Sequence, residues 1–278
     1  MVELAGISAL DRPLFDQTAQ LRPRAAVDGL TSFDIELHDS WTSLRGVHGG
    51  YMASLAARAA ERVAPNRAVR TVATSFLRPG GVGPAQLDVE VLRKGRSFTT
   101  LEVGLRQDGR LVCTSRVTTL TTTGGPEWAP QVTDRPAHLA SCVAFTPPAA
   151  IRHFEHAELR IDPATTPDGT ADFARVAGHV RPLDRRPVDA AWLVMIGDWF
   201  PPSPFRRLLP PLGGVSVDYT VHIHRLPSGE QASDDDGWLE GVFVTADSTA
   251  AIALERGVLS DGDGITIAET FHTRYTGG

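Results

Sequence analysis

The sequence predicts an α+β fold in which two curved antiparallel sheets are each wrapped around a central helix. One order of segments, a helix followed by several alternating strands, occurs twice in the 278 residues. Each half also ends in a hairpin marked by Asp-Gly, at Asp108-Gly109 and Asp263-Gly264, a dipeptide that favours tight turns between strands. Since one helix covers several strands in each half, we expect each sheet to curve around its helix.

The first half begins with an alternating strand and continues through a helix into further strands. Apolar residues recur at helical spacing over residues 48–63 and in alternation over the segments on either side. The expected elements are a strand at 32–37, the helix at 48–63, strands at 71–78 and 85–93, and a hairpin of 97–106 with 110–120.

The second half repeats this order, which indicates a duplicated domain. The segment between the halves is rich in Thr, Gly and Pro and only weakly periodic, so we expect a surface linker there. We place the N-terminal domain at residues 1–125, the linker at 126–148 and the C-terminal domain at 149–278. The expected elements of the second half are strands at 157–161 and 172–180, a helix at 188–200, strands at 215–225 and 238–245, and a hairpin of 249–259 with 265–275.

The composition excludes several classes of protein. With 27 Lys and Arg against 33 Asp and Glu, the net charge is −6, which disfavours nucleic acid and anionic lipid as partners. The two cysteines, Cys113 and Cys142, suit neither a disulfide framework nor a zinc site. The acidic residues Glu3 and Asp11 are not typical of a secretory leader. No apolar run is long enough to span a membrane. We expect a cytoplasmic protein without a membrane span.

Three familiar site motifs are not favoured. The run from Gly214 to Asp218 differs by one residue from the G-x-S-x-G nucleophile elbow, but it opens a strand where the elbow needs a strand-to-helix turn. The pairs His153/His156 and His222/His224 lack further ligands at metal-binding spacing. No strand leads into a G-x-G-x-x-G loop or a P-loop. We expect neither a metal nor a cofactor.

The start of the first helix is a candidate binding site. It reads His48-Gly49-Gly50-Tyr51, and the free N–H groups of a first helical turn favour an oxyanion. The two glycines would let a ligand approach the backbone closely. Alternatively, the glycines only permit close packing of the helix against the sheet, and His48 is a solvated or N-cap-like histidine.

Asp198 is the candidate catalytic carboxylate. It interrupts the apolar stretch of residues 190–200 near the end of the second helix. Burial and the C-terminal end of the helix dipole both oppose its negative charge, so we expect a raised pKa, as suits a general base. The alternative is an exposed Asp on the polar stripe of the helix.

A set of motifs follows one order along most of the chain. They are residues 48–52 (HGGYM), 76–79 (FLRP), 91–112, the Asp198 helix with Pro201-Pro202, residues 216–219 (SVDY) leading to His224-Arg225, Trp238-Leu239, and 256–264. In these motifs the chain resembles the acyl-CoA thioesterase II group of double-hotdog proteins. The resemblance implies that each half is a hotdog domain, a curved antiparallel sheet around a long helix, and that the two pair as a pseudo-dimer.

The resemblance also implies a set of catalytic residues. In that group an Asp, a Thr or Ser, and a Gln orient a water against the thioester carbonyl. The matching positions here are Asp198, Ser216 and His272. His272 departs from the pattern, because histidine can hydrogen-bond as glutamine does but can also titrate near neutral pH. The histidine either keeps the water-holding role with a new pH dependence or marks different chemistry, unless the register is two residues off.

We therefore expect an acyl thioester hydrolase acting on acyl-CoA or on acyl groups of a carrier protein, and a homo-oligomer as is common in that group. Asp198, Ser216 and His272 would activate a water, with the oxyanion or substrate held by His48, Gly49, Gly50 and Tyr51. The acyl chain would lie between the halves against Trp192, Met195 and Phe76. Two alternatives stay open: a hotdog dehydratase, hydratase or polyketide-type tailoring enzyme, and a non-catalytic acyl-CoA-binding protein.

Overall fold

The computed structural model describes residues 14–25, 30–121, 128, 131–184, 186–208, 214–226 and 237–277. The expectation that the chain carries no leader rests on residues 1–13, which lie outside the described residues. Part of the predicted linker also lies outside them. Among the helices that are described, none is both long enough and apolar enough to cross a membrane.

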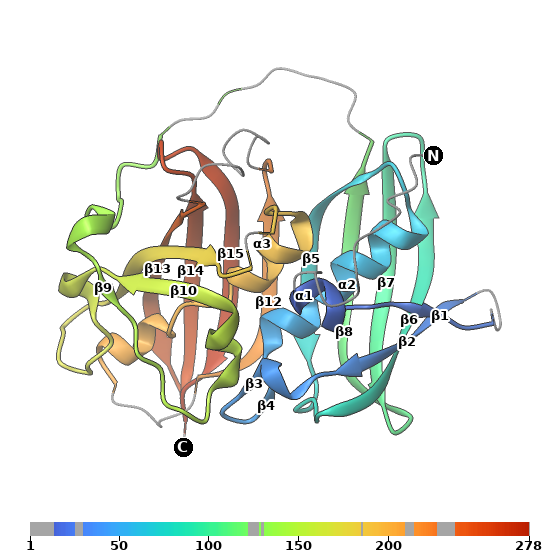
Figure 1. Ribbon diagram of the computed structural model, residues 1–278, viewed down its shortest axis with the longest axis horizontal. Helices are drawn as coiled ribbons and strands as arrows, with labels where there is room; N and C mark the ends of the chain where they lie inside the picture. The colour runs from blue at the N-terminus through green and yellow to red at the C-terminus, as the bar shows by residue number, and fades with distance from the viewer. Residues whose placement is uncertain are drawn as a thin grey trace.

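A single antiparallel sheet of 13 strands forms the body of the described chain (Figure 1). Its order is β1-β2-β6-β7-β8-β5-β12-β15-β14-β13-β11-β10-β9, and a separate small ribbon pairs β3 with β4. The strands are β1 (Arg22–Pro23), β2 (Thr31–Leu37), β3 (Thr42–Ser43), β4 (Gly46–Val47), β5 (Ala68–Phe76), β6 (Gly83–Lys94), β7 (Phe98–Gln107), β8 (Arg110–Leu120), β9 (Val143–Ala144), β10 (Ala157–Ile161), β11 (Ala174–Pro182), β12 (Val215–Ile223), β13 (Leu239–Thr249), β14 (Ile252–Ser260) and β15 (Thr266–Tyr275).

The two predicted sheets are joined into one at the centre of the molecule. There β5 from the first half pairs with β12 from the second, in a register that runs from Ser75 opposite Asp218 to Thr71 opposite His222. Backbone hydrogen bonds along these two strands make the sheet continuous from one half to the other. Each expected strand is present with bounds that differ by a few residues, and the described part of the linker contains β9, which pairs with β10.

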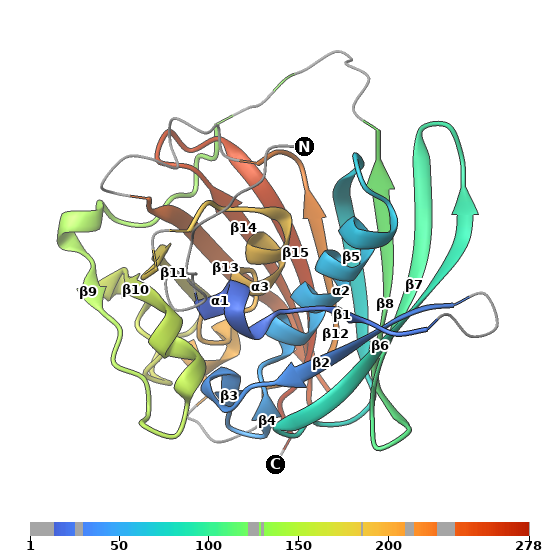
Figure 2. The same cartoon turned by 45° about the vertical axis from the view of Figure 1, so that its right-hand side comes forward.

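Two helices pack against the sheet and against each other. The helix α2 (Gly49–Val63) lies on β5, β6, β7 and β8, and α3 (Ala190–Ile196) contacts α2, β5 and β12 (Figure 2). The second helix is shorter than the expected 188–200, because it begins after the N-cap Asp189 and because i to i+3 bonds close the turn after Ile196. The shorter helices are α1 (Leu14–Thr18), η2 (Asp39–Trp41), η3 (Leu139–Ser141), η4 (Arg152–His156), η5 (Pro163–Thr165) and η6 (Ser203–Arg206).

The contact between α2 and α3 needs a glycine at the start of α2. A Cβ on Gly50 would lie 2.6 Å from the carbonyl oxygen of Met195 and 2.9 Å from Cβ of Asp198. Only a residue without a side chain allows the two backbones to come this close. The alternative interpretation, close packing of the helix on the sheet, does not describe Gly50, whose close neighbours are Met195 of α3 and Asp198. The same close approach places Asp198 beside the first turn of α2.

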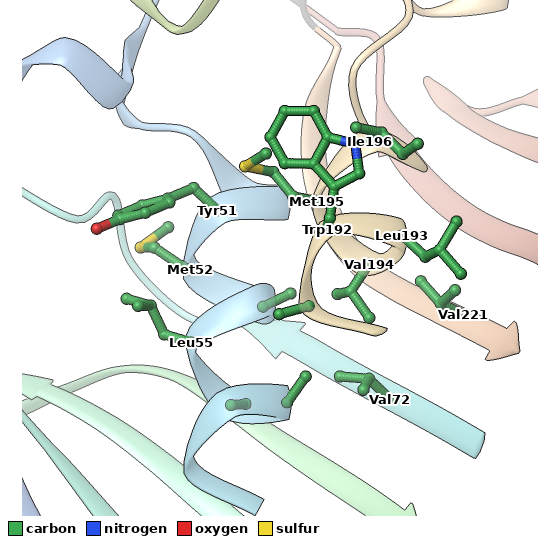
Figure 3. Close-up of a cluster of buried hydrophobic side chains, with 14 of the residues drawn as sticks. Tyr51, Met52, Leu55, Val72, Trp192, Leu193, Val194, Met195, Ile196 and Val221 are labelled. Atoms are coloured by element: carbon green, nitrogen blue, oxygen red, sulfur yellow. The ribbon is translucent and has the colours of Figure 1, made fainter. Parts of the chain in front are cut away.

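The core is continuous across the two helices. In Figure 3, Tyr51, Met52 and Leu55 extend from the side of α2 away from α3, whereas Leu193 and Val194 of α3 lie near Val221 of β12 and Val72 of β5. Trp192 and Met195 belong to this core, with 1% and 0% of their surface exposed. The prediction that these two residues line the acyl-chain pocket is wrong, because α3 turns them toward α2 and away from the pocket surface.

Candidate functional site

Asp198 lies at the centre of a cluster of polar groups, just after the end of α3. Its Oδ2 accepts a hydrogen bond of 3.0 Å from the N–H of Gly50 and lies 3.4 Å from Nε2 of His48. Its Oδ1 accepts a hydrogen bond of 3.2 Å from Nη2 of Arg274 and lies 3.4 Å from Nδ1 of His272. Only 8% of the residue is exposed, so the alternative of an exposed Asp198 is wrong.

The expectation of a raised pKa for Asp198 is also wrong. Burial on its own would raise this pKa, but His272, His48, Arg274 and the N–H of Gly50 together lower it to about 2. Hydrogen bonds and cationic neighbours stabilise the charged form of a carboxylate. Asp198 is therefore a carboxylate at neutral pH, suited to orienting a neighbouring group and stabilising positive charge on it.

Ser216 and His272 come together across two neighbouring strands. The hydroxyl of Ser216 on β12 lies 2.7 Å from Nε2 of His272 on β15. The register shifts between Ser216 and Asp218, so that Val217 has no partner on β15. Burial, with Arg274 nearby, lowers the pKa of His272 to about 4. The expectation that His272 titrates near neutral pH is therefore wrong, and its imidazole is neutral there.

His48 holds its neighbours in place through both ring nitrogens. Its Nδ1 accepts a hydrogen bond of 3.2 Å from the N–H of Tyr51, which caps α2. Because Nδ1 is an acceptor, the proton lies on Nε2, which donates to the main-chain oxygen of Asp198 at 2.9 Å. The N-cap interpretation of His48 is thus correct, and the same ring ties the backbone of Asp198 to the start of α2.

The first turn of α2 uses most of its N–H groups inside the protein. The N–H of Gly50 donates to Asp198 and that of Tyr51 to His48. Among the described residues, no acceptor is found for the N–H of Gly49, and Gly49 borders the pocket described below. The assignment of an oxyanion site to this turn stays a prediction. Its candidate donor is the N–H of Gly49.

Arg274 and Glu255 also belong to this cluster, and neither was predicted from the sequence. Nε of Arg274 donates to Oε1 of Glu255 at 2.8 Å, and Oε2 of Glu255 accepts from the N–H of Ser203 at 2.6 Å. Both charged side chains are almost fully buried. Residues two apart on a strand face the same side of the sheet. Because His272 was already a candidate, this alternation could have identified Arg274 as its neighbour. Glu255 lies directly opposite His272 on β14.

His153 was also missed as a neighbour of the site. Its ring stacks on that of His48 with 4.1 Å between the ring centres. The sequence suggested His153 and His156 only as an unfavoured metal pair. Within the described ranges there is no group of three or more His, Cys, Asp or Glu side chains that could hold a metal ion.

A pocket of about 550 Å³ opens onto this cluster. Its polar end contains Asp198, Ser216 and Arg274, together with His48 and Gly49. This volume falls in the range of small-molecule sites, about 300 to 1,000 Å³. Its apolar wall includes Phe76, as predicted, and also Phe145, Phe154, Trp199, Phe200 and Phe205.

Acid is expected to destabilise the protein, because four histidines are buried in neutral form. Burial lowers the pKa of His48 and His153, and lowers that of His156 and His272 from 6.5 to about 4. From pH 6.5 down toward 4 the unfolded chain binds protons that the folded chain does not, so the free energy of unfolding falls. Thermal unfolding followed by circular dichroism should show a midpoint that decreases steadily over this interval.

The variant His156→Phe tests the origin of that decrease. His156 stacks on Trp41 at 3.8 Å between ring centres, a contact that phenylalanine can keep. Removal of one titrating group should make the midpoint fall less steeply with acid. A midpoint that stays constant between about pH 6.5 and 4.5 in the unaltered protein would contradict the expectation.

Comparison with known proteins places the chain in a family. A family model described as the acyl-CoA thioesterase C-terminal domain matches residues 125–275, and one described as the N-terminal domain matches residues 37–123. The chain belongs to the acyl-CoA thioesterase family. An uncharacterized protein of Mycobacterium tuberculosis is 32% identical over 123 residues, which are 41% of this chain and 41% of that one. The match thus spans about two fifths of the length of that relative.

Solved structures show that this acyl-CoA thioesterase family member has the hotdog fold. A protein of unknown function with a hotdog fold from Alicyclobacillus acidocaldarius has a TM-score of 0.83 and 21% identity, over 95% of this chain and 98% of that one. The tesB protein of Mycobacterium avium subs paratuberculosis has a TM-score of 0.75 and 22% identity, over 95% of this chain and 98% of that one. The α+β class predicted from the sequence is confirmed.

Proposed function

We propose that this protein hydrolyses acyl thioesters, with acyl-CoA or an acyl group on a carrier protein as its substrate. The observation that carries the proposal is the convergence of a carboxylate, an imidazole and a hydroxyl, Asp198, His272 and Ser216, at the polar end of an apolar pocket. Membership in the acyl-CoA thioesterase family supports it. We add as proposals the cytoplasmic location and the homo-oligomer expected above.

The same proposal includes two hotdog units, at residues 1–125 and 149–278, with 126–148 as their linker. The repeated order of helix and strands supports this division, as does the packing of α2 against β5 to β8. In this arrangement the site belongs to both units. The first contributes the N–H of Gly50, and the second contributes the carboxylate that accepts its hydrogen bond.

In the proposed reaction, the acyl chain occupies the apolar part of the pocket and the thioester carbonyl lies at the start of α2. The N–H of Gly49 faces the developing oxyanion. Neutral His272 accepts the proton of the water that completes hydrolysis, and ionised Asp198 stabilises the imidazolium that results. Ser216, hydrogen-bonded to Nε2 of His272, fixes the direction in which that proton moves.

A panel of acyl-CoA and acyl-pantetheine thioesters tests this function. The rate of free-thiol release should be proportional to enzyme concentration and should saturate with substrate concentration. The dependence of this rate on acyl-chain length would indicate the depth of the pocket. Enoyl thioesters run in parallel test the dehydratase alternative. Addition or loss of water without thiol release, or tight acyl-CoA binding without any product, would overturn the proposal in favour of the other two functions.

A further inference from the structure

We propose that Ser216 is a nucleophile, and that the acyl group passes to its Oγ as an ester before water releases it. This inference rests on the proposed thioester hydrolysis and adds a covalent step to it. It also changes the role of Ser216, from a group that orients a water to a catalytic residue that bonds to the substrate.

The geometry that points to this step is a chain of three side chains through one ring. Ser216 Oγ lies 2.7 Å from Nε2 of His272, and Nδ1 on the far side of the ring lies 3.4 Å from Oδ1 of Asp198. A hydroxyl on one imidazole nitrogen and a carboxylate on the other is the arrangement that activates serine for attack on a carbonyl, and it recurs on unrelated folds. It is recognised by geometry and not by position in the sequence.

The protonation of the ring suits this role. Among the described side chains, Nδ1 of His272 has no hydrogen-bond partner of good geometry, and the acidic oxygen nearest to it is Oδ1 of Asp198. A proton on Nδ1 leaves the lone pair of Nε2 free to accept from Ser216. Oδ1 of Asp198 lies 3.4 Å from Nδ1 but is poorly aligned with its N–H, as is common before substrate binds. The neutral state of the imidazole keeps this lone pair available.

Glutamine at the same position would not support the step. The resemblance to the thioesterase II group places glutamine where this chain has His272, and an amide oxygen can accept a hydrogen bond but takes no proton at neutral pH. The imidazole can take the hydroxyl proton outright. Histidine in this place, with a serine hydroxyl already bonded to it, is therefore what makes the nucleophilic route available.

Access to the hydroxyl is provided by the pocket. Ser216 borders it and is partly exposed, whereas His272 behind it is 3% exposed. Gly49 borders the same pocket, and its N–H is the donor for the oxyanion in the proposed reaction. Ser216 lies within a strand and not on the strand-to-helix elbow that G-x-S-x-G requires.

The covalent step proceeds as follows. Oγ attacks the thioester carbonyl carbon while its proton moves to Nε2 of His272. The tetrahedral intermediate collapses, the C–S bond breaks, and the same proton goes to the departing thiolate, which leaves as free thiol. A water then attacks the ester carbon and gives its proton to Nε2. The C–O bond to Ser216 breaks, the carboxylic acid leaves, and Oγ recovers the proton.

Two labelling experiments test the proposal on the full-length protein. Rapid acid quench with an acyl-CoA, followed by intact-mass and peptide mapping, should show the mass of one acyl group on Ser216. A fluorophosphonate, which forms a stable bond to an activated serine whatever the rate of ester hydrolysis, should label the same residue. Ser216→Ala should carry neither label and should lose about 10³-fold or more in kcat.

Ser260→Ala is the matched control, because that buried hydroxyl contacts Glu240 and lies outside the pocket; it should keep both labels. Thiol release at the normal rate without an acyl or phosphonyl group on Ser216 would overturn the covalent step and leave the proposed hydrolysis standing. A Ser216→Ala variant within tenfold of the unaltered kcat would do the same. Absence of thiol release from every substrate would overturn the hydrolysis itself.

Discussion

Asp198→Asn is expected to lower kcat for thioester hydrolysis by about 10³-fold, with the fold intact. The remaining amide oxygen can still accept from the N–H of Gly50, which directs the new NH2 group toward His272 and Arg274. That NH2 group is a donor and cannot accept a hydrogen bond from an N–H at Nδ1 of His272. The imidazole proton therefore shifts to Nε2. The ring then has no lone pair for Ser216 or for water. Steady-state thiol release measures kcat for both proteins, and circular dichroism shows whether the variant keeps its fold.

Asp162→Asn is the matched control for this variant. Asp162 is also 8% exposed and also accepts backbone N–H groups, from Ala137 and Ala164, but it lies outside the pocket. The control should lose some stability and keep its kcat. Full activity of Asp198→Asn, or an equal loss of kcat in both variants, would refute the role given to Asp198.

Glu255→Ala is expected to lower the free energy of unfolding by about 3 to 5 kcal/mol, the cost of leaving one member of a buried ion pair without its partner. Among the described carboxylates Arg274 would keep that of Asp198 alone, and the N–H of Ser203 would lose its acceptor. Urea unfolding should show a lower midpoint. Glu255→Gln, which keeps one of the two acceptor oxygens, should show a midpoint between those of the unaltered protein and Glu255→Ala.

The exposed pair of Glu102 and Arg116 provides the comparison. Arg116 is 63% exposed there, so water screens the interaction and Glu102→Ala should cost at most about 1 kcal/mol. An equal, small cost for both glutamates would show that the Arg274 pair contributes no more than a surface contact. It would also remove the argument that Glu255 holds Arg274 against Asp198.

The local pattern of apolar and polar residues was sufficient to predict most of the strands and the first helix. Alternation marked β12 and β15, and the Asp-Gly turns marked the two hairpins, because those features depend on neighbouring residues. The joining of β5 to β12 could not be predicted, since an edge strand and an inner strand can carry the same alternation.

Within the site, local reasoning identified the carboxylate but gave the wrong direction for its pKa. Burial of Asp198 was inferred correctly from its apolar neighbours. The groups that reverse the effect of burial are distant in sequence: Gly50 is 148 residues before Asp198 and Arg274 is 76 residues after it. Which donors meet a buried charge depends on the tertiary fold, so the sign of the shift could not be obtained from one helix.

The pairing of β5 with β12 has a consequence for synthesis on the ribosome. The strand β5 is complete at Phe76 and joined to β8 by Leu120, yet the partner for its other side begins only at Val215. Throughout that interval the nascent chain presents an open row of backbone donors and acceptors, which invites pairing with another chain. Translation stalled between these points would leave a fragment prone to aggregate, and a fragment that ends before residue 198 would also lack Asp198.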